Sequence, residues 1–363
     1  MRIQQETKEN REGKRSSWVG EPLYVGVDLH KNKSWITAMT KEGQVRFSFE
    51  LRNKVESWQK VLQLLPEGSK IVFEASWNWF WQLELIGERF EVSLAHPLRT
   101  KAIASAKLKN DRVDSHMLAH LLRTQLLPQA YIPPREIRDL RELVRFRATL
   151  TRISTIVANK IHALLAKNGL SLAYSQVFGK KSLLWLRNLQ LRWPYKSQLE
   201  AYILLGEQIN RLKEALMEKI KREAEARQEV RLLRTMPGVG DFLALLMVAE
   251  IGDIERFASP AKLVSYAGLS PAVRCSGGRR KRGRLAKEGN KWLRWAAVEV
   301  AMHIKRLSPH FAAYYNRLAA RKGKPTAQVA TARKVLQTVW FMLKHKQGYI
   351  EKGASEHLLG TAP

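Results

Sequence analysis

The sequence predicts a mixed α/β domain at the N-terminus, a helical coiled-coil middle and a mostly α-helical C-terminal domain. Three observations lead to this assignment. Short apolar runs alternate with turn residues and helical patterns up to about residue 130. Apolar residues then recur every seven positions after Pro133 and Pro134. Finally, the segment Met236–Gly240 precedes a further series of apolar helical patterns.

The N-terminal pattern predicts five strands and at least three helices. Tyr24, Val25 and Val27 are strand formers, and Gly26 between them permits another backbone to approach closely. In chain order we expect strands at Tyr24–Asp28, Trp35–Thr40 and Gln44–Leu51, a helix at Val55–Leu65, a strand at Lys70–Glu74, a helix at Trp79–Arg89, a strand at Glu91–Ala95 and a helix through 111–122.

Four carboxylates occupy positions that predict a shared site. Asp28 and Glu74 each end a predicted strand, and Asp111 and Asp114 are three residues apart, so they share one face of a helix. Four carboxylates at one point repel each other unless cations lie between them. Hard oxygen ligands suit Mg²⁺ or Mn²⁺, and two such ions about 4 Å apart promote phosphodiester cleavage. The alternative is four unrelated surface carboxylates.

Two histidines lie beside these carboxylates in the sequence. His30 follows Asp28 by two residues, and His116 follows Asp114 by two. A lone histidine near a carboxylate more often supports a ligand than binds the metal itself, so neither is included in the predicted site.

Two long helices are expected in the middle of the chain. In the helix from Arg135 to Asn168, Leu143, Leu150, Val157 and Leu164 recur every seven residues, with Phe146 and Ile153 three further on. A second helix is predicted from about Ser197 to Arg234, with Ile209, Leu212 and Leu216 on one face. Together they predict an antiparallel coiled-coil pair.

The C-terminal part combines a glycine-containing turn with a strongly basic segment. The turn at 236–240, followed by an apolar helix at Phe242–Ile251, resembles a helix-hairpin-helix, in which the amides of Gly238 and Gly240 would grip a phosphate. Glycines at 277, 278, 283 and 289 predict a loop, and a helix resumes from Asn290. Nine basic residues and one Glu give the segment 274–294 a net charge of +8; the basic ones are Arg274, Arg279, Arg280, Lys281, Arg282, Arg284, Lys287, Lys291 and Arg294.

Charge and composition restrict the class of protein. The 363 residues hold 63 Lys and Arg against 33 Asp and Glu, and a net charge of +30 favours a polyanionic partner, either nucleic acid or an anionic membrane. One cysteine excludes an internal disulfide framework and a thiolate zinc site. No apolar run approaches 18 residues and the start lacks an apolar core, so we expect no membrane span, no secretory signal and a cytoplasmic location.

The segments GVDLHKNK, FEAS and KNDRVDSHMLA resemble the catalytic segments of DEDD transposases of the insertion-sequence one-hundred-ten family, which includes the Piv/MooV invertases. TMPGVG, YAGLSP and SGGRRKRGRLAKEGNKWLRWA are similar to the family's C-terminal segment, so the resemblance runs from about residue 22 to 345. It implies a RuvC-like RNase H fold for the first domain, catalysis and metal binding by Asp28, Glu74, Asp111 and Asp114, and a serine nucleophile, for which Ser276 before Gly277 is the matching position. It also implies donor and target DNA, a guide RNA and a homo-oligomer, either a dimer or a tetramer.

The resulting domain prediction has five parts: a flexible tail at 1–21, a RuvC-like catalytic domain at 22–130, a coiled-coil linker at 135–234, a transposase domain at 235–346 and a tail at 347–363. The function predicted is that of a DNA transposase or recombinase with an acidic metal site and a serine nucleophile. Two alternatives stay open from the residues themselves. One is a metal-dependent Holliday-junction-type endonuclease that uses water, and the other is a non-catalytic nucleic-acid-binding protein.

Overall fold

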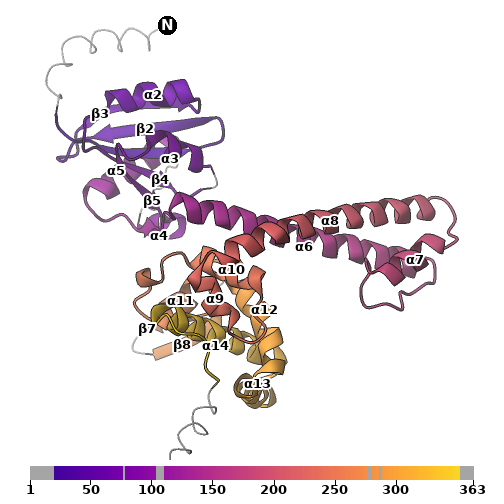
Figure 1. The fold of residues 1–363 in the computed structure, drawn as a ribbon. Coiled ribbons are helices and arrows are strands. Elements are labelled where there is room, and N and C mark those ends of the chain that lie inside the picture. Colours follow the sequence, from indigo (N-terminus) through magenta and orange to yellow (C-terminus); the bar gives the residue numbers. More distant parts are fainter. Residues whose placement is uncertain (1–19, 77, 104–109, 277–278, 286–287, 352–363) are drawn as a thin grey trace, which may run out of the picture. The chain divides into compact units, whose positions relative to one another are not determined.

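The computed structural model describes the backbone of residues 20–76, 78–103, 110–276, 279–285 and 288–351, and the side chains of all these except 272–276 and 279–285 (Figure 1). Internal packing groups the chain into two compact units, one ending at Ile132 and the other beginning at Pro133. The finer predicted division of the second unit into 135–234 and 235–346 stays a prediction. Among the helices described, none is long and apolar enough to cross a membrane.

The first unit is built on a mixed six-stranded sheet, which confirms the predicted α/β layout. The strand order is β3-β2-β1-β4-β5-β6, with β1 antiparallel to β2 and parallel to β4, and this arrangement is consistent with an RNase H-like fold. Among these strands, only the short β6 was not predicted. The strands are β1 (Tyr24–Leu29), β2 (Lys33–Met39), β3 (Val45–Arg52), β4 (Lys70–Glu74), β5 (Glu91–Ala95) and β6 (Gln129–Ala130).

Alternation along the strands separates two faces of this sheet. Val25 and Val27 of β1 lie in one apolar cluster with Trp58 of α2. Val72 of β4 lies in a different cluster, with Leu118 of α5. Asp28 is two residues from Gly26 and therefore belongs to the face that α5 covers. The helices are α2 (Val55–Leu64), α3 (Phe80–Ile86), α4 (Pro97–Ile103) and α5 (Asp111–Arg123).

Helix α5 lies directly against the backbone of β1. A Cβ atom built on Gly26 would be 2.1 Å from the carbonyl oxygen of Ser115 and 2.4 Å from the amide nitrogen of Ala119. A buried hydrogen bond of 2.7 Å between the hydroxyls of Thr37 and Ser115 ties the same turn of the helix to β2. The close approach anticipated at Gly26 is therefore made by the helix that carries Asp111 and Asp114.

In the second unit the helices α6 (Arg135–Lys167) and α8 (Tyr195–Glu225) pack against each other in opposite directions, with α7 (Lys180–Asn188) between them in sequence (Figure 1). Ile161 of α6 shares a cluster with Leu199 of α8, whereas Leu140 near the start of α6 shares one with Ile220. The antiparallel pairing is thus present. Supercoiling of the pair stays a prediction.

Three details of the middle segment were predicted wrongly. Phe146 and Ile153 are exposed, because the second buried row of α6 lies four residues after the first, at Ser154 and Ile161. Leu212 is also exposed, so it does not belong to the buried face of α8 that includes Ile209. The second helix also ends at Glu225, and a separate helix α9 (Gln228–Arg234) begins after Arg227, whose backbone is extended.

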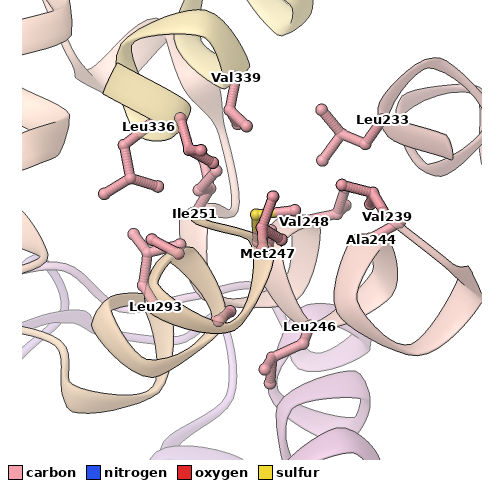
Figure 2. Close-up of a cluster of buried hydrophobic side chains, with 14 of the residues drawn as sticks. Leu233, Val239, Ala244, Leu246, Met247, Val248, Ile251, Leu293, Leu336 and Val339 are labelled. Carbon is pink, nitrogen blue, oxygen red and sulfur yellow. The ribbon is translucent and has the colours of Figure 1, made fainter. Parts of the chain in front are cut away.

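The rest of the second unit is a group of helices around α10 (Asp241–Ile251). Residues 244–251 of α10 are all buried, so this helix forms the centre of the core (Figure 2). Around it Leu233, Leu293, Leu336 and Val339 come from three other helices. The remaining helices are α11 (Pro260–Tyr266), α12 (Lys291–Leu307), α13 (Pro309–Lys322) and α14 (Lys324–Lys344), with a short 3₁₀ turn at Ile254–Arg256.

The basic segment is not the loop that its glycines predicted. It forms an antiparallel pair of strands, β7 (Pro271–Ser276) and β8 (Arg279–Leu285), in which Ser276 pairs with Arg279 and Arg274 with Lys281. An extended backbone is open to these residue types, and the pairing itself satisfies their amides and carbonyls. Gly277 and Gly278 lie outside the described residues. We call this element the serine hairpin, residues 271–285.

Candidate active site

Asp28 is the centre of the acidic site in the first unit. It lies at the end of β1, where the parallel register with β4 places Glu74 at the end of the neighbouring strand. Its side chain is only 11% exposed. Burial raises the pKa of Asp28 to about 6, and the charge of nearby His30 opposes that rise. The carboxylates of Asp114, Asp111 and Glu74 raise the pKa further, in that order of size.

Asp111 and Asp114 reach this region because of where α5 begins. The side chain of Asn110 accepts a hydrogen bond of 2.8 Å from the amide of Val113 and so caps the helix. Asp111 is the first helical residue and Asp114 lies in the same turn. The helix start is therefore fixed by Asn110, while contact at Gly26 fixes how far the helix lies from β1.

His30 lies between the carboxylate of Asp28 on β1 and the carboxylate of Asp111 on α5. Its Nε2 atom is 3.2 Å from Oδ2 of Asp28 and 3.4 Å from Oδ1 of Asp111. The loop that carries it is held by two side-chain amides, since Nδ2 of Asn53 and Nδ2 of Asn78 donate to the His30 carbonyl at 2.7 and 2.8 Å. Sequence reasoning left His30 out of the site. Its position two residues after Asp28 was the signal that it lies at the same sheet edge.

The donor atoms at this point suit a divalent cation. A carboxylate oxygen from Asp28, one from Asp111 and a ring nitrogen of His30 all lie within 4.8 Å of one another. The raised pKa of Asp28 has like charges among its causes, and a cation between the carboxylates relieves that repulsion. Glu74 and Asp114 are outside this closest group of described ligand atoms, although their charges act on Asp28.

The predicted nucleophile and its basic neighbours belong to the second unit. Ser276 is the last residue of β7, and the paired strand β8 contains Arg279, Arg280, Lys281, Arg282 and Arg284. Lys287 lies outside the described residues. The hairpin therefore brings together, in two short strands, most of the basic residues proposed to contact nucleic acid.

The structure also describes the other four residues that were predicted to contact nucleic acid. Gly238 has a φ of +82°, and a Cβ there would be 2.9 Å from Cβ of His303, so both backbone and packing require glycine. Gly240 is the N-cap of α10 and has open space around it. Lys291 is exposed, with its ammonium 5.4 Å from the ring of Trp292, and Nη1 of Arg294 donates to the Ala267 carbonyl at 3.2 Å. Phosphate binding by these four residues stays a prediction.

Two family profiles match this chain, one covering the acidic site and the other covering the serine hairpin. A sequence profile of the IS110 DEDD transposases matches residues 25–168, and one described as transposase IS116/IS110/IS902 family matches residues 230–316. The transposase for insertion sequence element IS1111A of Coxiella burnetii is 25% identical over 333 residues, covering 90% of each chain. The transposase for insertion sequence element IS1328 of Yersinia enterocolitica is 24% identical over 329 residues, covering 87% of this chain and 95% of the relative.

Proposed function

The chain belongs to the IS110 family of DEDD transposases, and from this premise we propose that it cuts and rejoins DNA through the acidic site around Asp28 and a serine nucleophile at Ser276. The observation that carries the proposal is the convergence of Asp28, His30 and Asp111 at one edge of the sheet. DNA is the substrate that membership of a transposase family implies. A net charge of +30 supports such a polyanionic substrate.

The acidic site binds the metal in this proposal. Asp28 and Asp111 supply carboxylate oxygens, and Glu74 and Asp114 complete the set of four. Two Mg²⁺ or Mn²⁺ ions, when bound, activate an attacking oxygen and stabilise the leaving one. His30 keeps the Asp28 and Asp111 side chains oriented through its two contacts, or binds a cation itself through Nε2. Either role depends on the two amides that hold the His30 carbonyl.

The strand-transfer step uses the serine hairpin. The hydroxyl oxygen of Ser276 attacks a backbone phosphorus, a serine Oγ–P bond forms, and the ester bond to the neighbouring deoxyribose oxygen breaks. The serine hydroxyl gives up its proton as it attacks, and the departing oxygen takes up one proton to become a hydroxyl. Arginines of β8 stabilise the added negative charge on phosphorus. Attack by a deoxyribose hydroxyl on the serine ester then reverses these bonds and rejoins the strands, so the bond energy is conserved.

The remaining parts of the proposal come from the family resemblance. A structured guide RNA selects donor and target DNA, and the enzyme works as a homo-oligomer, either a dimer or a tetramer. Sequencing the RNA and DNA that co-purify with the protein tests the guide. A preparation that carries no discrete RNA species and still selects its target overturns that part.

The acidic site is tested by neutralising one ligand at a time. Asp28→Asn, Glu74→Gln, Asp111→Asn and Asp114→Asn are each expected to abolish Mg²⁺-dependent cleavage and to weaken Mn²⁺ binding measured by calorimetry. The matched control is Asp139→Asn, because Asp139 is exposed on α6 and outside the site. Wild-type cleavage by any two of the four variants overturns the shared site.

The serine step is tested by trapping the reaction in denaturant and mapping DNA-linked peptides by mass spectrometry. We expect a phosphodiester at Ser276 in the wild-type protein and none in Ser276→Ala. Cleavage without any linked peptide favours the endonuclease that uses water.

A further inference from the structure

Glu250 is a carboxylate that the proposed reaction does not use. Asp28 and Glu250 are the two acidic residues that are buried among those the structure describes, and Glu250 is 0% exposed. It lies in the last turn of α10, between Ala249 and Ile251, in a helix that is otherwise apolar from 242 to 251. A charge in such a place requires dedicated partners.

Two arginines of α6 provide part of that partnership. Nε and Nη2 of Arg145 donate to the two carboxylate oxygens of Glu250 at 2.6 and 2.8 Å, which is the paired geometry typical of arginine with a carboxylate. Arg141, one turn earlier, donates from Nε to the Ala249 carbonyl at 2.7 Å and from Nη2 to the Glu250 carbonyl at 2.9 Å. The end of α10 is thus held to α6 through both side chain and backbone.

Another partner of the Glu250 carboxylate comes from the segment that follows the serine hairpin. Asn290 follows β8 and caps α12, because its Oδ1 accepts from the amides of Trp292 and Leu293, each at 3.0 Å. Those two bonds fix the orientation of the side-chain amide. Its Nδ2 therefore points the other way and donates to Oε2 of Glu250 at 2.7 Å.

The segment that leads into the hairpin is held at the same point. Tyr266 ends α11, shortly before β7, and its hydroxyl donates to the Glu250 carbonyl at 3.4 Å while accepting from Nδ2 of Asn290 at 3.2 Å. The backbone amide of Asn290 donates to the Tyr266 carbonyl at 2.7 Å. A Cβ on Gly289 would be 2.6 Å from the amide nitrogen of Gly268, so the chain entering the hairpin and the chain leaving it touch backbone to backbone.

A buried ion pair is weak evidence for a purely stabilising role, since apolar residues of similar volume often stabilise a core as well or better. Hydrogen bonds are directional, whereas apolar contacts are not. The hydrogen bonds around Glu250 therefore fix the positions of the individual atoms that they join. Tyr266 and Asn290, which precede and follow the serine hairpin, are among the groups fixed in this way.

We propose that Glu250 is the positioning residue of the serine hairpin, acting through Asn290 and Tyr266 to place Ser276, with Arg145 connecting that placement to α6. The proposal rests on the proposed role of Ser276. It assigns no contact with DNA or metal to Glu250 itself.

The test compares two single variants and their combination. Glu250→Gln removes the charge at nearly constant size. Asn290→Ser keeps a good N-cap residue for α12 but is too short to reach Glu250, so it removes the connection and spares the helix. The matched control is Glu207→Gln, which breaks the Arg187–Glu207 ion pair elsewhere in the second unit. The readouts are the rate of DNA–Ser276 link formation and the fluorescence anisotropy of a dye on Cys275, the chain's single cysteine.

Both single variants are expected to lower the anisotropy of the Cys275 dye and to slow link formation about a hundredfold, the loss that follows a misplacement of about 1 Å. The double variant should be no slower than the slower single variant, because both changes cut the same connection. Glu207→Gln should match the wild type.

A folded Asn290→Ser protein with wild-type anisotropy and link formation overturns the proposal, and so do effects that multiply in the double variant. If Glu250→Gln does not fold, Asn290→Ser still decides the question. A wild-type protein that forms no serine link overturns the serine mechanism alone, and the anisotropy of the variants then decides the positioning role.

Discussion

The close approach of α5 to Gly26 allows the sharpest prediction about the acidic site. A Cβ at position 26 would lie 2.1 Å from the Ser115 carbonyl oxygen, whereas ordinary contact begins at 3.4 Å, so Gly26→Ala must displace α5 by about 1.3 Å. Both atoms that it meets are backbone, and no side-chain rotation relieves the clash. Helix α5 carries Asp111 and Asp114, and these carboxylates must move with it, away from Asp28.

Two effects should follow from Gly26→Ala. Overpacking is expected to destabilise the first unit by about 1–3 kcal/mol, seen as faster hydrogen exchange of the β1 amides. Displacement of the ligands by about 1 Å is expected to lower the cleavage rate in Mg²⁺ about a hundredfold and to weaken Mn²⁺ binding in calorimetry.

Leu62→Ala separates these two effects. Leu62 is buried on α2 in the cluster on the opposite face of the sheet, so its truncation should destabilise the unit by about 2–5 kcal/mol without moving α5. We expect Leu62→Ala to keep wild-type Mn²⁺ affinity at a temperature where both variants are folded. A folded Gly26→Ala protein with wild-type Mn²⁺ affinity and cleavage would refute the reasoning that the α5–β1 distance sets the site.

Three further predictions concern the second unit. The first replaces four basic residues of β8 by Glu: Arg279, Arg280, Lys281 and Arg282. The DNA affinity of this variant should depend less on salt, and the log–log slope should fall by about 0.9 for each phosphate that the protein no longer neutralises. An unchanged slope in filter binding would remove the hairpin from the interface. Trp340→Phe removes the 2.9 Å hydrogen bond from Nε1 to the buried Phe257 carbonyl, and calorimetry should show a loss of about 1–3 kcal/mol; no loss would mean that another donor replaces the indole. Burial, followed by the hydrogen bond to Glu351, raises the pKa of Tyr349 to about 12 from its ordinary value of 10.0. Between these values the unfolded chain releases the proton and the folded chain keeps it, so stability falls as pH rises, and Tyr349→Phe should show a shallower alkaline loss in unfolding titrations.

Local patterns were enough to predict most of the sheet and its helices. Runs such as those at 24–28 and 70–74 are apolar, short and bounded by turn residues, and the structure has strands at both places. The errors lie where one apolar pattern is compatible with two different buried faces of a helix. Residues three and four positions after Leu150 both lie near it on the helix, and only packing against α8 selects Ser154 over Ile153.

The serine hairpin illustrates a different failure. Its glycines and arginines carry no strand signal, and the extended conformation arises because Pro271–Ser276 and Arg279–Leu285 pair with each other. Such pairing satisfies backbone groups of residues that are not neighbours in sequence, and the residues of either strand alone do not predict it.

The sequence by itself determined what kind of protein this is. Its motifs identify the transposase family, its excess of Lys and Arg indicates a polyanionic partner, and its strand-end and helix-face carboxylates mark where ligands could converge. Each of these is a property of residue type and local spacing. The tertiary structure alone decided that His30 lies between Asp28 and Asp111 and that Gly26 sets the distance of α5 from the sheet. It also decided that Glu250 joins α6 to the segments before and after the serine hairpin. These contacts join residues up to about a hundred positions apart, and they exist only once the chain has folded and excluded water from the groups involved.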